Sequence, residues 1–155
     1  MLPPPDIDVG APAGSSAACW SVQLEVAAFE ADRPVLLAGH QLLVDAYGAQ
    51  HAGRGSIRLP YSLVGLHLAL DRGWTGIAVR ALHGRMGKPR PDWPAFERPP
   101  FRGRTILDVA TAGARSGSLP GHEASVLAWA EDVWAAWSTE HDAVAALAAR
   151  VLDQG

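Results

Sequence analysis

A long apolar repeat dominates the C-terminal part of the chain. It begins after Leu119-Pro120 and places apolar side chains at three- and four-residue steps, at Val126, Ala130, Val133, Trp137, Val144, Leu147 and Val151. This near-heptad register predicts a helix that buries one face against other helices. At 1.5 Å per residue the pattern would span roughly 50 Å. We therefore expect a break near Ser138-Thr139, where Thr139 and Asp142 have the spacing of a capping box.

Shorter helices are predicted upstream of this repeat. They begin at Ser15 or Ser16, at Pro34, at Pro60 and at Thr75, and the last three extend to about His51, Leu70 and Met86. A hydroxyl or a proline suits the first turn of a helix, and Gly73 suits the end of the third one. Residues 105–109 are expected to form a short extended piece. The sequence thus predicts an all-α fold, a helical bundle of four to six helices.

A proline-rich segment interrupts these helical patterns. Residues 87–104 contain five prolines, which exclude a regular helix or a central strand. The segment also holds Trp93, Phe96 and Phe101, and three aromatic rings are costly to leave in water. We therefore expect a long proline-rich loop or lid that is ordered because its aromatic side chains pack on the bundle.

The length and composition fit one helical domain. Residues 1–14 are rich in Pro, Gly and Ala without periodicity and are predicted to form a flexible N-terminal arm, followed by a single helical domain over residues 15–155. With 155 residues, 48% of them apolar, the chain can bury its own core. It has no basic stretch followed by an apolar signal segment and no run of about 18 apolar residues, so we expect a cytoplasmic protein without a membrane partner.

The charge balance and the cysteine content narrow the function classes. The chain has 13 basic and 16 acidic residues and a net charge of −3. Its overall charge therefore does not favour binding to nucleic acid, which would need a local basic patch. A single cysteine, Cys19, excludes an internal disulfide and a cysteine-rich zinc site and agrees with a reducing compartment. Cys19 lies on the apolar side of its helix, so we interpret it as a core residue rather than a nucleophile. A homo-oligomer is left open.

The segment from His40 to His51 is the most informative for function. At 100° per residue, Val44, Tyr47 and His51 fall within about 40° of His40, so two histidines and a tyrosine share the expected buried stripe. Gln41 and Asp45 point away from it. Buried polar groups need partners, because each unsatisfied one costs about 1–3 kcal/mol. These side chains are therefore either hydrogen-bonded to one another or line a pocket.

A metal site is one interpretation of these histidines. His40 and His51 lie eleven residues apart, which is roughly 16 Å along a helix, so they cannot both bind a zinc ion that takes nitrogen ligands at about 2 Å. His67 on the next helix would come level with Tyr47, and His141 or His122 would have to complete the set. The metal candidates are thus His51, His67 and His141. The alternatives are a structural polar network and a metal-free small-molecule pocket, and no spacing such as HExxH favours the metal.

The same segment resembles a known family. His40, Leu42, Val44, Asp45, Tyr47, Gln50 and His51 match the pattern H-x-L-x-V-D-x-Y-x-x-Q-H of a bacterial family catalogued as domain of unknown function 5946. The similarity extends to Cys19-Trp20, to His67-Leu68, and to Trp129 through Trp134 with His141. Here Ala52 stands where members often have proline, and one cysteine where some have a pair. The resemblance implies a helical domain of this size and no activity.

The proline-rich region is also basic. Between Arg80 and Arg104 there are seven basic and two acidic residues, interleaved with aromatic ones, which is typical of loops that bind phosphate or single strands of nucleic acid. The anion-binding candidates are Arg90, Arg98, Arg102 and Arg104. Residues 121–155 carry six acidic residues and Arg150 alone, so we favour a loop that lies across an acidic helical face. His83, at a helix end, is interpreted as a cap.

Three functions follow from these observations. We favour a small binding or accessory domain with an internal polar pocket, and its candidate residues are His40, Asp45, Tyr47, Gln50, His51 and His67. The first alternative is an enzyme of hydrolase or thiol transferase type, in which a histidine-bound divalent metal activates water or a thiol. The second is binding of an anion or nucleic acid through the basic-aromatic loop of residues 80–104.

Overall fold

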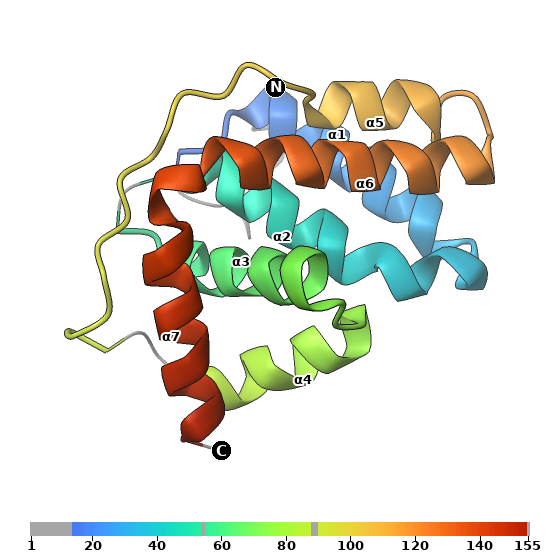
Figure 1. The fold of residues 1–155 in the computed structure, drawn as a ribbon. Helices are drawn as coiled ribbons and strands as arrows, with labels where there is room; N and C mark the ends of the chain where they lie inside the picture. The colour runs from blue at the N-terminus through green and yellow to red at the C-terminus, as the bar shows by residue number, and fades with distance from the viewer. Residues whose placement is uncertain (1–13, 54, 88–89, 155) are drawn as a thin grey trace, which may run out of the picture.

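The computed structural model describes residues 14–53, 55–87 and 90–154, and this part of the chain is all-helical (Figure 1). Its seven α-helices are α1 (Ala17–Ala31), α2 (His40–His51), α3 (Arg58–Leu66), α4 (Gly76–Met86), α5 (Ile106–Ala112), α6 (Leu119–Ala136) and α7 (His141–Asp153). Three short helical segments join them: η1 (Pro34–Gly39), η2 (His67–Asp71) and η3 (Ser138–Glu140). The expected arm lies outside the described residues, apart from Gly14.

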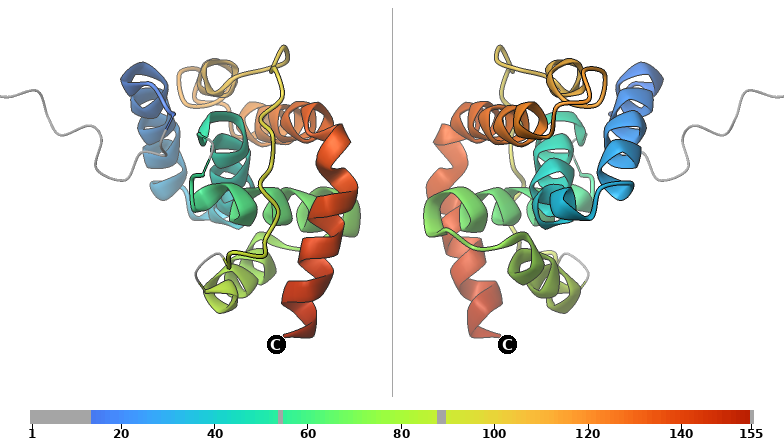
Figure 2. Two further views of the ribbon diagram at one scale, coloured as in Figure 1. Left: turned by 90° about the vertical axis from the view of Figure 1, so that its left-hand side faces the viewer. Right: turned by 90° about the vertical axis from the view of Figure 1, so that its right-hand side faces the viewer.

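Helix α2 occupies the centre of the molecule. It packs most extensively on α3 and also contacts α6, α4 and α1 (Figures 1 and 2). Small residues allow the close approach to α3: a Cβ on Gly48 would lie 2.1 Å from Ser62 Oγ, and a Cβ on Gly65 would lie 2.0 Å from Asp45 Oδ2. Because neighbours surround α2, it is buried on more than the one face that its sequence pattern predicts.

Tryptophans of α6 and the following turn connect the last helices to α2. Trp129 and Trp137 are fully buried. The Trp129 indole N–H donates to Gln50 Oε1 at 2.9 Å, and the Trp137 indole N–H donates to the Ala49 carbonyl at 3.0 Å. Each large ring thus enters the core with its polar atom satisfied, as a buried indole requires.

Several element boundaries differ from the sequence-based expectation. The C-terminal helix does break where expected, with η3 at Ser138–Glu140, but Glu140 stands at the N-cap of α7 and Thr139 makes no cap. The expected extended piece at residues 105–109 is wrong, because Thr105 and Asp108 form a capping box that starts α5. These changes bring the number of described α-helices to seven, against four to six expected.

The third helix also ends in an unexpected way. Helix α3 stops at Leu66, and residues His67–Asp71 continue it as a π-helical turn. Gly73, with φ of +69°, then turns the chain in the left-handed conformation that favours glycine. Such π turns are rare and re-aim the side chains around them.

Residues 90–104 contain no helix and run along one side of the molecule between α4 and α5 (Figure 1). Trp93 and Phe96 in this segment are buried, and Phe101 is partly buried against the core. Of the helices in the described ranges, none is both long and apolar enough to cross a bilayer.

Candidate functional site

A cleft of about 750 Å³ opens between α1 and α4, and its floor is formed by α2 and α3. Both flanking helices lie on the same side of the central pair (Figure 2). Trp20, Leu24, Val44 and Ile57 give the cleft apolar walls, and the last three are substantially exposed. A volume of this size lies within the range of small-molecule sites, which are apolar with a few placed polar groups.

The carboxyl group of Asp45 lies at the floor of the cleft. It is 3% exposed and packs against Gly65 of α3, where no larger residue fits. Burial raises the pKa of Asp45 well above its usual range, and the hydrogen bond from Gln41 Nε2 at 3.1 Å only partly offsets that effect. Burial therefore favours the protonated, uncharged form of Asp45.

Gln41 connects Asp45 to a histidine of α4. Its Nε2 group lies 3.4 Å from His83 Nδ1. Burial lowers the pKa of His83, against a smaller opposite effect of the Tyr61 backbone, so the imidazole is neutral at neutral pH. If the ring accepts from Gln41 at Nδ1, its proton resides on Nε2. Asp45, Gln41 and His83 form a polar row across the floor and one wall of the cleft.

Two residues that line the cleft each have a buried polar atom without a hydrogen-bond partner. These atoms are Gln23 Oε1 on α1 and His83 Nε2 on α4. Buried polar atoms of folded proteins are nearly always paired, and an unpaired one costs about 1–3 kcal/mol. Both helices that flank the cleft thus carry an unsatisfied polar group on a lining residue.

Tyrosines stand beside these groups. The Tyr61 ring meets His83 edge-on at 5.6 Å, and the Tyr47 ring lies 5.5 Å from that of Trp20. Burial raises the pKa of both phenols, so both hydroxyls stay protonated at neutral pH. The Tyr47 hydroxyl is hydrogen-bonded to Ser15.

A second polar cluster lies next to the cleft, and two of its members, Glu30 and His122, line a smaller pocket of about 280 Å³. Glu30 of α1 is 1% exposed, and its carboxylate accepts from His40 Nδ1 at 2.8 Å and from His122 Nε2 at 2.9 Å. Burial alone would raise the pKa of Glu30, but the hydrogen bonds and charges of His122 and His40 lower it below its usual value. This carboxylate is thus charged and fully engaged. His122 Nδ1 packs against Gly113 without a partner.

The structure separates most of the residues that the sequence grouped together. His51 stacks on Tyr47 at 4.1 Å and donates to the Tyr47 carbonyl at 3.2 Å, which makes a local contact within α2. Burial lowers the pKa of His51, and the nearby Arg98 lowers it further. Gln50 is buried between Trp129 and the Arg104 carbonyl, to which its amide donates.

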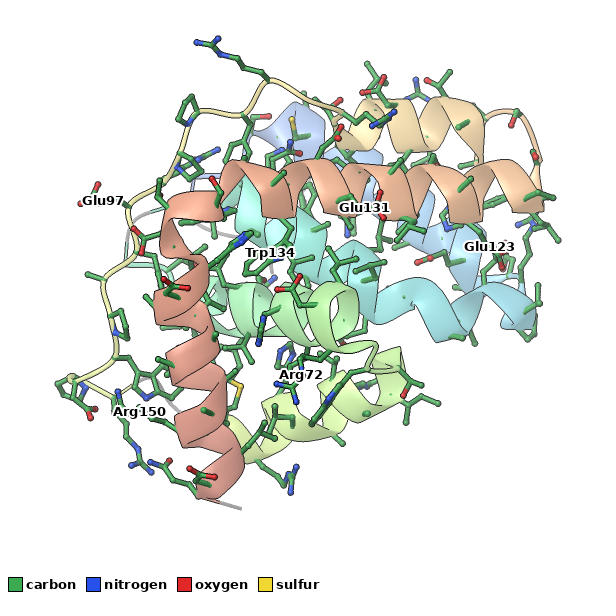
Figure 3. The ribbon with its side chains drawn as sticks, in the orientation of Figure 1. Arg72, Glu97, Glu123, Glu131, Trp134 and Arg150 are labelled. Atoms are coloured by element: carbon green, nitrogen blue, oxygen red, sulfur yellow. The ribbon has the colours of Figure 1, made fainter. Side chains whose placement is uncertain are left out.

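His67 and His141 lie at another place, around Trp134. His67 Nδ1 donates to Asp71 Oδ2 at 2.9 Å, and the Trp134 indole N–H donates to the same carboxylate. His141 stacks on Trp134 at 3.8 Å and donates to its carbonyl oxygen. Figure 3 shows Trp134 beneath α6, on the side that faces α3. His67 therefore meets neither His40 nor His51.

This placement bears on the metal candidates His51, His67 and His141. Each makes its own contacts with a different tyrosine, aspartate or tryptophan neighbour. Within the described residues, no three His, Cys, Asp or Glu side chains come together in a group that could hold a metal ion. The three histidines do not form a shared site.

The basic candidates of the proline-rich segment also have protein partners. Arg104 forms an ion pair with Asp132 of α6 at 2.9 Å, and Arg98 donates to the Gln50 carbonyl at 2.5 Å. Arg102 is exposed, and Arg90 lines a separate small pocket. The Arg104 contact is of the kind expected from a loop that lies on an acidic helical face.

Sequence reasoning missed Gln23 and Glu30, and it gave His83 and His122 other roles, a helix cap and a possible metal ligand. Glu30 carried a signal, because it continues the apolar stripe of Val26 and Phe29 at helical spacing. An acidic residue in such a stripe demands a buried partner. His83 was interpreted as a helix cap, although its side chain contributes to the cleft.

Comparisons with known proteins give a family but no function. Residues 8–138 match a family described as "Family of unknown function (DUF5946)". No curated protein and no solved structure matches the chain. Because the matched region covers most of its length, the chain belongs to this family of unknown function.

Proposed function

We propose that this protein is a small-molecule binding domain whose ligand occupies the cleft between α1 and α4. The observation that carries the proposal is a pair of lining residues on opposite walls that each hold a buried, unpartnered atom, Gln23 Oε1 and His83 Nε2. A ligand that pairs with both would remove a penalty of about 1–3 kcal/mol per atom. Binding would thus offset the cost of keeping these groups in the folded protein.

The chemistry of the cleft suits a largely apolar ligand. Trp20, Leu24, Val44 and Ile57 supply apolar surface, much of it exposed. The Gln23 carbonyl oxygen would accept a hydrogen bond from the ligand, and His83 Nε2–H would donate one. The carboxyl group of Asp45 is buried and its raised pKa favours the uncharged form, which reduces the repulsion of a negatively charged ligand.

The rest of the fold supports this function as a scaffold. We propose one domain over residues 15–155 that acts in the cytoplasm, with the proline-rich loop packed on the bundle through the buried Trp93 and Phe96. The loop would hold the bundle in shape, because its Arg104 pairs with α6 and its Asp92 pairs with Arg150 of α7. The metal enzyme is the weaker alternative, since its histidines lie apart.

The neutral fluorescent probe N-phenyl-1-naphthylamine tests the proposal, because its emission rises in an apolar site. We expect saturable binding to the wild-type protein and loss of binding in Ala27→Trp, which fills the cleft from α1. The matched control is Ala28→Trp, since its neighbour Ala28 is exposed outside the cleft and should leave binding unchanged.

A second variant approaches from the other wall. A Cβ on Gly84 of α4 meets no atom within 4 Å, so Gly84→Phe can enter the cleft without disturbing the core. It should also abolish binding while the circular dichroism spectrum stays helical. If the wild type binds no probe, or if both filling variants still bind it, the cleft is not a binding site.

A further inference from the structure

We infer that the ligand of this cleft is an amphipathic anion, a molecule with an apolar body and one carboxylate, sulfonate or phosphate group, which is held by Arg58 and Arg80. The inference rests on the proposed binding function and goes further by naming the chemical class of the ligand. Both arginines line the cleft, Arg58 from the start of α3 and Arg80 from α4.

Arg58 and Arg80, like the exposed Arg90 and Arg102, differ from three other arginines in what they contact. Arg104, Arg115 and Arg150 each form an ion pair with a carboxylate: Asp132, Glu25 and Asp92. Within the described residues, neither Arg58 nor Arg80 has such a partner. Their guanidinium groups are exposed and available to a ligand, and guanidinium recognises carboxylate and phosphate through parallel hydrogen bonds.

The other charged groups near the cleft do not compete for these arginines. The one carboxyl residue that lines the cleft is Asp45, which is buried against Gly65 and hydrogen-bonded to Gln41. Glu30 behind it is bound by His40 and His122. The cleft is therefore lined by positive and neutral groups, although the whole chain has a net charge of −3. This local reversal of sign favours an anion.

The α4 wall adds a matching donor. Arg80 and His83 are three residues apart and so lie on the same face of the helix, and both line the cleft. His83 Nε2 is buried without a partner. Helix α3 begins at Arg58 without a side-chain cap, so the positive end of its dipole adds to the same region. Two guanidinium groups, an imidazole N–H and a helix start point to an anionic group as the ligand's polar end.

The apolar body of the ligand would lie toward α1. Trp20 and Leu24 line that side, and Leu24 is 49% exposed. Val44 and Ile57 extend the apolar surface across α2 toward α3. A ligand with both an apolar body and a charged group would use each part of the cleft, whereas inorganic phosphate would leave the apolar walls exposed.

A pair of matched probes tests the inference on the full chain. The probes are 8-anilinonaphthalene-1-sulfonate and N-phenyl-1-naphthylamine, which share one ring system and differ in the sulfonate. In the double variant Arg58→Gln/Arg80→Gln we expect the Kd of the sulfonate probe to rise at least about tenfold, because charge-assisted hydrogen bonds are lost. The Kd of the neutral probe should change less than about twofold.

The control variant, Arg90→Gln/Arg102→Gln, removes two exposed positive charges outside the cleft. It should leave the Kd of both probes within about twofold of wild type. Added salt should weaken the binding of the sulfonate probe and leave the binding of the neutral probe unchanged. If the cleft variant weakens both probes equally, or the control variant weakens the sulfonate probe as strongly, the inference is overturned and the binding cleft stands. If neither probe binds the wild type, the proposed function itself fails.

Discussion

Glu30 and Asp45 are both buried carboxyl residues on neighbouring helices, and their surroundings differ. Glu30 accepts from two imidazoles, His40 and His122, and its pKa is lowered. Asp45 has one amide donor, Gln41, and burial raises its pKa. The first group forms two ion pairs, and the second lies at the floor of the larger cleft, where burial favours its protonated form.

The difference separates a structural cluster from a candidate binding site. A buried carboxylate with two donors stabilises the contact between α1, α2 and α6, because removing any partner leaves an uncompensated charge. The polar row of Asp45, Gln41 and His83 instead contains no ion pair and lines the larger cleft, although His83 Nε2 and His122 Nδ1 both lack a partner. Residues whose polar groups are left unsatisfied in the folded protein are expected to occur at functional sites. The predictions below test this contrast.

The largest effect is expected at Glu30. Glu30→Ala leaves His40 and the fully buried His122 without their acceptor, and we expect a loss of about 3–5 kcal/mol in the free energy of unfolding. Urea unfolding followed by tryptophan fluorescence measures it. The matched control is Glu25→Ala on the same helix, whose exposed pair with Arg115 should contribute less than about 1 kcal/mol. Equal losses in both variants would show that the buried cluster contributes nothing special.

A smaller and opposite effect is expected at Asp45. Above the ordinary aspartate pKa of 3.8 and below its raised value, the folded protein holds one proton more than the unfolded chain, so the stability that Asp45 contributes falls as pH rises. Asp45→Asn keeps the shape of the neutral acid and cannot ionise. We therefore expect the free energy of unfolding of the variant to rise relative to wild type as pH increases from 5 to 8, by at most about 1.4 kcal/mol per pH unit.

Urea unfolding at several pH values measures this gain. The pH dependence due to Glu30 has the opposite sign, because its pKa is lowered in the folded protein. Glu30 therefore contributes stability above its ordinary pKa of 4.5, and this contribution is lost as pH falls through the lowered pKa. At acid pH, the loss of unfolding free energy should therefore be the same in Asp45→Asn and wild type. A constant difference between the two proteins from pH 5 to pH 8 would mean that the pKa of Asp45 is not raised.

The fold was largely predictable from local patterns. The apolar repeat and its break at residues 138–140 required only helical periodicity and length. The prediction of an extended piece at α5 was wrong for a physical reason. Ile106, Leu107 and Val109 have side chains that are common in strands, but the capping box of Thr105 and Asp108 stabilises the start of a helix. That spacing was visible in the sequence, and it outweighs residue preference in so short a segment.

The candidate site was less predictable because it depends on tertiary contacts. The helical projection assumed one buried face on α2, but Ala46, Gly48 and Ala49 let α2 sit at the centre, so Asp45 is buried as well. His40, assigned to the buried stripe, is instead 39% exposed. The Glu30–His122 pair joins residues 92 positions apart. No local pattern encodes such a partner.

The smallest change in stability is expected at His83. Because its Nε2 has no partner, His83→Leu should alter the free energy of unfolding by less than about 1 kcal/mol, whereas His122→Leu, which removes a donor from Glu30, should cost about 3 kcal/mol. His83→Leu should also weaken binding of the sulfonate probe. In His122→Leu, the molecules that remain folded should bind this probe as wild type does. A histidine that matters for binding and hardly for folding distinguishes the cleft from the Glu30 cluster. If His83→Leu is as destabilising as His122→Leu, both regions are structural and the contrast between them fails.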